Sequence, residues 1–159
     1  MARRHWLVKS EPFKYAWDAL VRDGRTHWDG VRNYEARNNL AAMEVGDLAL
    51  YYHSNEGKEV VGVARVCRES YPDPTSDDPQ WVVVDVEPLV ALAKPVALAA
   101  IKKDPALAGM QLLRRSRLSV VPVEKAEFER VLALGVTRLP KTANGASRAK
   151  RGRASALGS

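Results

Sequence analysis

The strongest constraint on the fold is a pair of strand-like runs in the middle of the chain, separated by a turn. Residues 48–53 are apolar and aromatic, and residues 60–67 form a second apolar run. The intervening residues 54–58 include Ser, Asn and Gly, which are typical of turns. Gly62 in the second run indicates a bulge or a close backbone approach. These patterns predict an antiparallel hairpin at the centre of the chain.

Short strands and short helices alternate on both sides of this hairpin. Apolar or alternating runs predict strands at residues 6–10, 81–87 and 118–123, with residues 88–92 as an extension of the second. Apolar spacing of three and four predicts helices at residues 15–22, 34–43, 96–103 and 124–134. This order predicts one small α+β domain, a curved or partly closed mixed barrel with helices at its ends.

The positive charge of the chain is confined to its C-terminal end. We expect the folded domain to span residues 1–137, where basic and acidic side chains balance, and residues 138–159 to form a tail. The tail is rich in Gly, Ala and Ser and has no apolar periodicity, which predicts disorder. It can hold phosphates without reading sequence, or act only as a solubilising extension. Its basic residues are Arg138, Lys141, Arg148, Lys150, Arg151 and Arg153.

Several classes of function find no support in the sequence. The three histidines are scattered, and Cys67 is the single cysteine, so we expect neither a metal site nor a disulfide. No phosphate-binding glycine loop or nucleophile elbow occurs, and we expect no cofactor. No run reaches the roughly 18–20 apolar residues of a membrane span, so we expect no membrane association. These features predict a cytoplasmic protein.

The most unusual stretch is residues 28–38, which is too polar for a core element and too aromatic for a plain loop. Trp28 offers a stacking face, Arg32 a cation, and Asn33 an amide that both donates and accepts. Such groups can hold a flat ring that is rich in heteroatoms. The alternative is structural, with Trp28 filling the core and Asn33 capping the helix that follows.

Four polar and aromatic stretches lie at the ends of predicted strands: residues 9–12, 28–37, 52–55 and 113–116. Strand ends converge on one rim of a barrel, and barrel mouths are favoured ligand sites. The stretches together therefore predict a pocket with aromatic walls and amide edges. A third interpretation is an interaction module whose rim binds a protein.

The same stretches resemble the motifs of the EVE domain family. The similarity rests on residues 6–12, 28–38, 46–47, 51–55, 71–75 and 112–120, and it runs from about residue 4 to residue 134. It implies a PUA-like fold, a small mixed β-barrel flanked by short helices that is shared with YTH and ASCH domains. It also implies binding of a modified nucleobase, with modified cytosine in DNA favoured and a modified RNA base as the other choice. A restriction-type partner protein is a further implication.

The resemblance also implies which residues bind. Trp28 corresponds to the pocket aromatic, Ser10 and Glu11 would read the base edge, and Arg32 with Asn33 would fix the base or its phosphate. Trp81 is a candidate second wall, with a core position as the alternative. The base-binding set implied is Lys9, Ser10, Glu11, Trp28, Val31, Arg32, Asn33, Tyr34, Tyr52, His53, Ser54 and Asn55. The residues implied to bind the nucleic-acid backbone are Arg37, Arg114 and Arg115.

An enzyme is the main rival to such a reader. ASCH relatives include amidohydrolases that act on an acylated nucleoside through a Lys and a Glu. Lys9 and Glu11 lie together at a strand end and could act as nucleophile or base and as acid. The structural alternative for these two residues is a surface ion pair.

Overall fold

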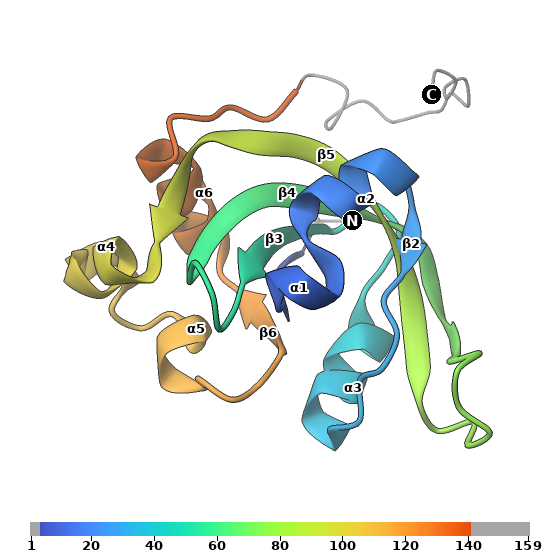
Figure 1. The fold of residues 1–159 in the computed structure, drawn as a ribbon. Helices are drawn as coiled ribbons and strands as arrows, with labels where there is room; N and C mark the ends of the chain where they lie inside the picture. The colour runs from blue at the N-terminus through green and yellow to red at the C-terminus, as the bar shows by residue number, and fades with distance from the viewer. Residues whose placement is uncertain (1–3, 141–159) are drawn as a thin grey trace.

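A computed structural model describes residues 4–140 and shows one six-stranded mixed sheet (Figure 1). The strand order is β2-β5-β4-β3-β1-β6, so β2 and β6 are edges and the sheet does not close. The predicted α+β class is confirmed, but closure of the barrel is not, since β2 is very short and pairs only with β5. The strands are β1 (His5–Ser10), β2 (Thr26–His27), β3 (Leu48–His53), β4 (Glu59–Pro72), β5 (Val82–Ala97) and β6 (Val120–Val123).

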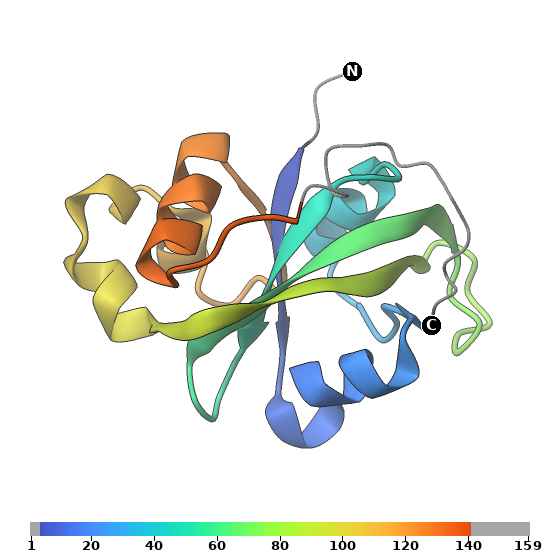
Figure 2. The same ribbon diagram turned by 90° about the horizontal axis from the view of Figure 1, so that it is seen from above.

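The helices form two groups around the sheet. Helices α4, α5 and α6 gather near the end of β5, whereas α2, with α1 beside it, packs against another part of β5, as Figures 1 and 2 show. Helix α3 lies apart from both groups and packs against β5 and β6. The tail prediction from residue 141 onward lies outside the described residues. The helices are α1 (Pro12–Tyr15), α2 (Trp17–Asp23), α3 (Tyr34–Ala42), α4 (Leu98–Lys103), the 3₁₀ helix η1 (Pro105–Leu107), α5 (Gln111–Arg114) and α6 (Lys125–Leu134).

The prediction of one continuous helix over residues 15–22 is wrong, because the structure has two short helices, α1 and α2, in its place. Ala16 is extended, with φ −80° and ψ 161°, and it separates α1 from α2. This break frees the backbone N–H of Trp17, which donates to Nε2 of His53 at 3.0 Å. A tertiary hydrogen bond from β3 therefore overrides the local helical pattern.

Strands β4 and β5 are longer than their sequence patterns predict. Their pairing shifts register at several places, including between Val63 and Ala64, where Pro88 of β5 lies opposite. Bulges of this kind bend strands and tolerate proline. The predicted extension to residue 92 therefore stops too early, because β5 continues to Ala97, and β4 likewise continues past its predicted end at residue 67 to Pro72.

The core centres on Tyr51 of β3, whose ring is fully buried. Trp17 and Trp28 each meet this ring edge-on, both with ring centroids 5.4 Å away. The Tyr51 hydroxyl donates to the carbonyl of Tyr15 at 2.6 Å. Tyr51 thereby joins β3 to residues 15–17 and to Trp28, and Tyr15 and Trp28 line the site described below.

Gly62 shows both features that the sequence predicts. The β3–β4 pairing shifts register between Tyr51 and Tyr52, and the β4–β5 pairing shifts between Val60 and Gly62. A Cβ atom at Gly62 would lie 2.6 Å from Trp17 ring atoms. The indole of Trp17 can approach β4 so closely only because no side chain is present there.

We expect Gly62→Ala to lower the free energy of unfolding by about 1–3 kcal/mol, the usual cost of overpacking a core. The matched control is Gly109→Ala, where a Cβ atom would meet nothing within 4 Å. Urea titrations of both variants measure the difference. Equal stability of the two variants would contradict the close approach of Trp17.

Candidate nucleic-acid interface

A cavity of about 760 Å³ opens beside the end of β1. Its walls combine segments from across the chain, and all four predicted rim stretches contribute to them. The lining residues are Lys9, Ser10, Glu11, Lys14, Tyr15, residues 26–32, Ser54, Ser116, Arg117 and Ser119. The predicted convergence of polar strand ends is therefore present in the structure.

Trp28 belongs to both the core and the cavity wall. Only 8% of its surface is exposed, and its ring packs on Tyr51. Its backbone N–H donates to the carbonyl of Val84 at 2.8 Å, which fixes its position beside β5. The structural and the ligand-binding interpretations of Trp28 are thus compatible, since a rigidly packed ring is a better stacking surface than a mobile one.

Polar groups at the end of β1 have separate partners. Lys9 Nζ donates to the carbonyl of Ser116 at 2.8 Å, and burial lowers the pKa of Lys9. Ser10 Oγ donates to the carbonyl of Tyr15 at 2.9 Å. Glu11 accepts from Asn55 at 3.0 Å and pairs with Lys14 at 3.4 Å.

Lys9 and Glu11 form no ion pair with each other among the described residues. The surface ion pair considered as their structural alternative is therefore wrong. Both side chains instead line the cavity, where each keeps a different partner.

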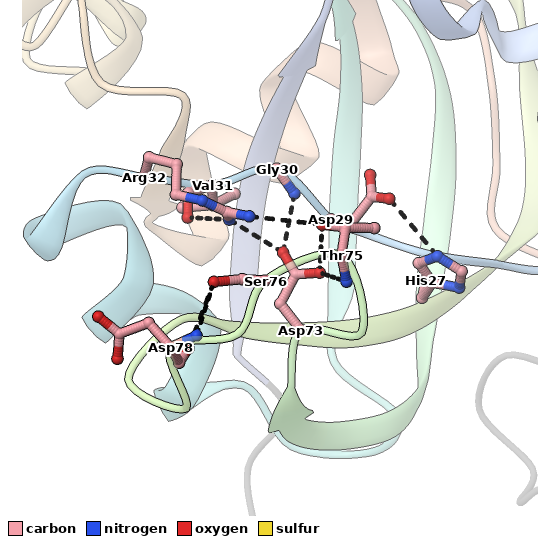
Figure 3. A network of polar contacts seen from close by, with 9 residues as sticks. All are labelled: His27, Asp29, Gly30, Val31, Arg32, Asp73, Thr75, Ser76 and Asp78. Atoms are coloured by element: carbon pink, nitrogen blue, oxygen red, sulfur yellow. Dashed lines mark hydrogen bonds and ion pairs between the residues drawn. The ribbon is translucent and has the colours of Figure 1, made fainter.

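Asp73 holds the part of the cavity wall formed by Gly30 and Arg32, and Figure 3 shows its hydrogen bonds. Its carboxylate accepts from Gly30 N at 3.1 Å, from Arg32 Nη1 at 3.0 Å, and from Thr75 N and Oγ1 at 2.7 and 2.6 Å. Burial alone would raise the pKa of Asp73. The hydrogen bonds from Thr75, Arg32 and Gly30 outweigh it and lower the pKa to about 2.

Sequence reasoning missed Asp73, although a signal was present. Asp73 follows Pro72 and precedes Pro74 and Thr75, and an Asp in such a loop often accepts hydrogen bonds from the backbone just after it. The contact with Gly30 and Arg32 spans about forty positions of sequence, and no local pattern encodes it.

The side chains of Arg32 and Asn33 both form hydrogen bonds within the protein. Arg32 lines the cavity but pairs with buried Asp73, and it also donates to Thr75 Oγ1 at 3.4 Å. Asn33 Oδ1 accepts from Ala36 N at 2.9 Å, which confirms the predicted cap of α3. Asn33 does not line the cavity, whereas buried Val31 does.

Tyr34, Arg37 and Trp81 form a stack outside the cavity. The rings of Tyr34 and Trp81 lie 5.1 Å apart, the Arg37 guanidinium sits 5.4 Å from the Tyr34 ring, and that of Arg32 sits 5.7 Å from the Trp81 ring. Tyr34 is 58% exposed. Trp81 thus does not contribute a wall to the cavity, where Tyr15 and Trp28 are the nearby aromatic rings.

Residues of the stretch over positions 52–55 line two different cavities. Ser54 lines the large cavity, whereas Tyr52, Ser54 and Asn55 line a smaller one of about 190 Å³. His53 accepts from Trp17 N at 3.0 Å, and burial lowers the pKa of His53.

The late basic segment, residues 113–117, contributes Ser116 and Arg117 to the cavity rather than the predicted Arg114 and Arg115. Arg115 forms a bidentate pair with Glu35, at 2.6 and 2.5 Å, and so ties the end of α5 to α3. Arg114 is exposed and lines neither cavity. Ser116 and Arg117 line the large cavity instead. Ser116 belongs to the predicted stretch over residues 113–116, and Arg117 directly follows it.

Within residues 4–140, no cluster of three His, Cys, Asp or Glu side chains could hold a metal ion. Cys67 is partly buried, and burial raises the pKa of its thiol to about 12, which keeps it protonated. None of the helices in the described part of the chain has the length and apolar character needed to cross a membrane.

Comparison with known proteins places this geometry in a family. The EVE domain model matches residues 4–134. The chain belongs to the EVE domain family. Human thymocyte nuclear protein 1 is 35% identical over 164 residues, covering 82% of this chain and 73% of that protein. The predicted family is therefore confirmed.

Several solved structures of other proteins are similar to this chain. A protein from Agrobacterium tumefaciens is 42% identical with a TM-score of 0.83, covering 87% of this chain and 99% of that one. Human THYN1 in complex with 5-methylcytosine-containing DNA is 34% identical with a TM-score of 0.78, covering 85% and 99%. The YTH domain of Zygosaccharomyces rouxii MRB1, at 17% identity, a TM-score of 0.55 and coverage of 87% and 89%, shows the shared PUA-like fold.

The EVE domain should lose stability in acid through Asp73. Because the folded pKa lies below the usual value near 3.9, the carboxylate stabilises the fold above about pH 4 and ceases to do so as the pH falls toward 2. We expect Asp73→Asn to lower the free energy of unfolding by about 1–2 kcal/mol at pH 7 and to flatten its decrease between pH 4 and 2.

The control for Asp73→Asn is Asp77→Asn, which removes an exposed carboxyl from the same loop. Urea unfolding at a series of pH values compares the two variants with the wild type. An unchanged pH profile in Asp73→Asn would show that the carboxylate is not clamped as described.

Proposed function

We propose that this EVE domain is a non-enzymatic reader of a modified nucleobase, with modified cytosine in DNA as the favoured ligand and a modified RNA base as the alternative. The observation that carries the proposal is the large cavity, whose walls combine Trp28 with hydrogen-bonding groups at the end of β1. The complex of human THYN1 with 5-methylcytosine-containing DNA supports it.

Recognition would begin with extrusion of the base from its strand. Flipping costs a few kcal/mol, and stacking on an aromatic ring returns roughly 1–3 kcal/mol. Trp28 is the stacking surface because its ring is held by Tyr51 and cannot rotate away. The cavity volume of about 760 Å³ lies in the range of sites that bind small molecules.

The edge of the base would meet both hydrogen-bond acceptors and hydrogen-bond donors on the cavity wall. A cytosine amino group donates, and the carboxylates of Glu11 and Asp29 on the cavity wall can accept from it. The ammonium of Lys9 can donate to an acceptor on the ring or to a phosphate. Buried Val31 offers an apolar contact for an added methyl group, worth about 0.8 kcal/mol, or roughly fourfold in affinity.

The described domain needs a further source of affinity, because its basic and acidic side chains nearly balance. The basic residues from 138 onward would supply sequence-independent phosphate contacts. A restriction-type partner protein is the other source that we propose, and the cytoplasm is the compartment in which we expect the reader to act.

Trp28 and Trp17 allow a matched test of the stacking role. Both rings meet Tyr51 at 5.4 Å and both are buried, but only Trp28 lines the cavity. We expect Trp28→Phe to weaken binding of a strand with 5-methylcytosine by about 3- to 10-fold. Trp17→Phe should lose comparable stability, about 1–3 kcal/mol, without this loss of affinity.

Fluorescence anisotropy with labelled strands at fixed salt measures these affinities. The wild type should bind the strand with 5-methylcytosine more tightly than the same strand with cytosine. An equal effect of the two tryptophan substitutions on affinity, or no preference in the wild type, would overturn the stacking role of Trp28.

One observation keeps the amidohydrolase as a second candidate. Lys9 lines the cavity and burial lowers its pKa, which favours the neutral amine that a lysine nucleophile requires. If the reader proposal is correct, the wild type forms no product from N4-acetylcytidine in a chromatographic assay. Product that disappears in Lys9→Ala but persists in Lys14→Ala, another cavity lysine, would replace the reader with an enzyme.

A further inference from the structure

The smaller cavity adjoins the base pocket. The two share Lys9, Ser54 and Ser116 in their walls. The hydrogen bond from Lys9 Nζ to the Ser116 carbonyl, at 2.8 Å, lies at this shared boundary. A ligand that leaves the large cavity across this boundary enters the smaller one.

The charges along this path are positive and available. Lys9 lines both cavities, Arg117 lines the larger and Lys58 the smaller. Among residues 4–140, none of these three cations forms an ion pair with a carboxylate. Of the two carboxylates in the large cavity, Glu11 pairs with Lys14 at 3.4 Å and Asp29 lies 3.5 Å from His27. Neither carboxylate lines the smaller cavity.

The hairpin turn beside the smaller cavity contains two residues other than glycine in the left-handed conformation. Asn55 and Lys58 both adopt left-handed conformations, with φ 71° and 48°. Asparagine tolerates this region, but for a residue such as lysine it costs roughly 1–2 kcal/mol. Left-handed residues other than glycine concentrate at functional sites. A lysine therefore stands where glycine would be more stable.

We propose that the smaller cavity binds the sugar and phosphate next to the extruded base, with the Lys58 ammonium on the phosphate. This inference rests on the proposed function, because it extends the base pocket along the same strand. The wall formed by Tyr52, Leu98 and Leu112 suits the apolar face of a sugar. The volume of about 190 Å³, a fraction of the 760 Å³ of the base pocket, suits a backbone unit rather than a second base.

The test replaces Lys58 with glycine, which removes the ammonium and relieves the left-handed strain. We expect Lys58→Gly to weaken binding of short single strands by about 3- to 10-fold, whether or not they carry 5-methylcytosine. The slope of log affinity against log salt should become shallower by about 0.7, the value for one phosphate contact to a single strand. Thermal unfolding should occur at the same or a higher temperature.

Two further variants isolate the charge. Lys58→Arg should retain affinity, because it keeps a cation at the same position. Lys125→Ala removes an exposed lysine from α6 that lines neither cavity, and it should bind as the wild type does. Unchanged affinity and salt slope in Lys58→Gly would overturn the phosphate site.

The same measurements separate this inference from the proposed function. A wild type that binds modified and unmodified strands equally, but loses affinity for both in Lys58→Gly, would refute the modified-base reader and support the phosphate site. A wild type that prefers the modified strand and is unaffected by Lys58→Gly would support the reader and refute the phosphate site.

Discussion

The parallel pairing of β1 with β3 is the contact on which the site depends. Its register places Lys9 opposite Tyr52 and Ser10 opposite His53. Parallel strands end on the same edge of a sheet, so the polar residues that follow both strands must emerge together. Because β1 also pairs with β6, it is buried on both sides and cannot slip without exposing its apolar residues. The part of the cavity wall that β1 supplies, Lys9 and Ser10, is therefore held in place by strands on both sides.

Two further contacts convert this edge into a defined pocket. Tyr51 holds Trp28 from inside the core, and Asp73 holds Gly30 and Arg32 from the loop after β4. The loop that carries Trp28 is consequently fixed at both its aromatic and its polar positions. A binding site that is ordered before the ligand arrives avoids part of the entropy cost of association. This ordering matters for a base reader, since flipping already consumes a few kcal/mol.

Local patterns predicted those parts of the fold whose partners are near in sequence. The central hairpin, the cap of α3 by Asn33 and the bulge beside Gly62 all follow from turn, capping and glycine chemistry. The break between α1 and α2 did not follow from such patterns, because it depends on His53. The last part of β5 did not either, since Val96 and Ala97 pair with β4 only beyond a shift in register.

The sequence by itself determined which groups are available for recognition: an aromatic ring, amides, carboxylates and cations at strand ends, in motifs specific enough to indicate the EVE family. Only the tertiary structure decided which of them face the cavity. It engages Arg32 with Asp73 and Arg115 with Glu35, while Lys58 receives no carboxylate partner among the described residues. The physical reason is that these ion pairs join segments far apart in the chain, and such pairings follow from sheet register rather than from local spacing.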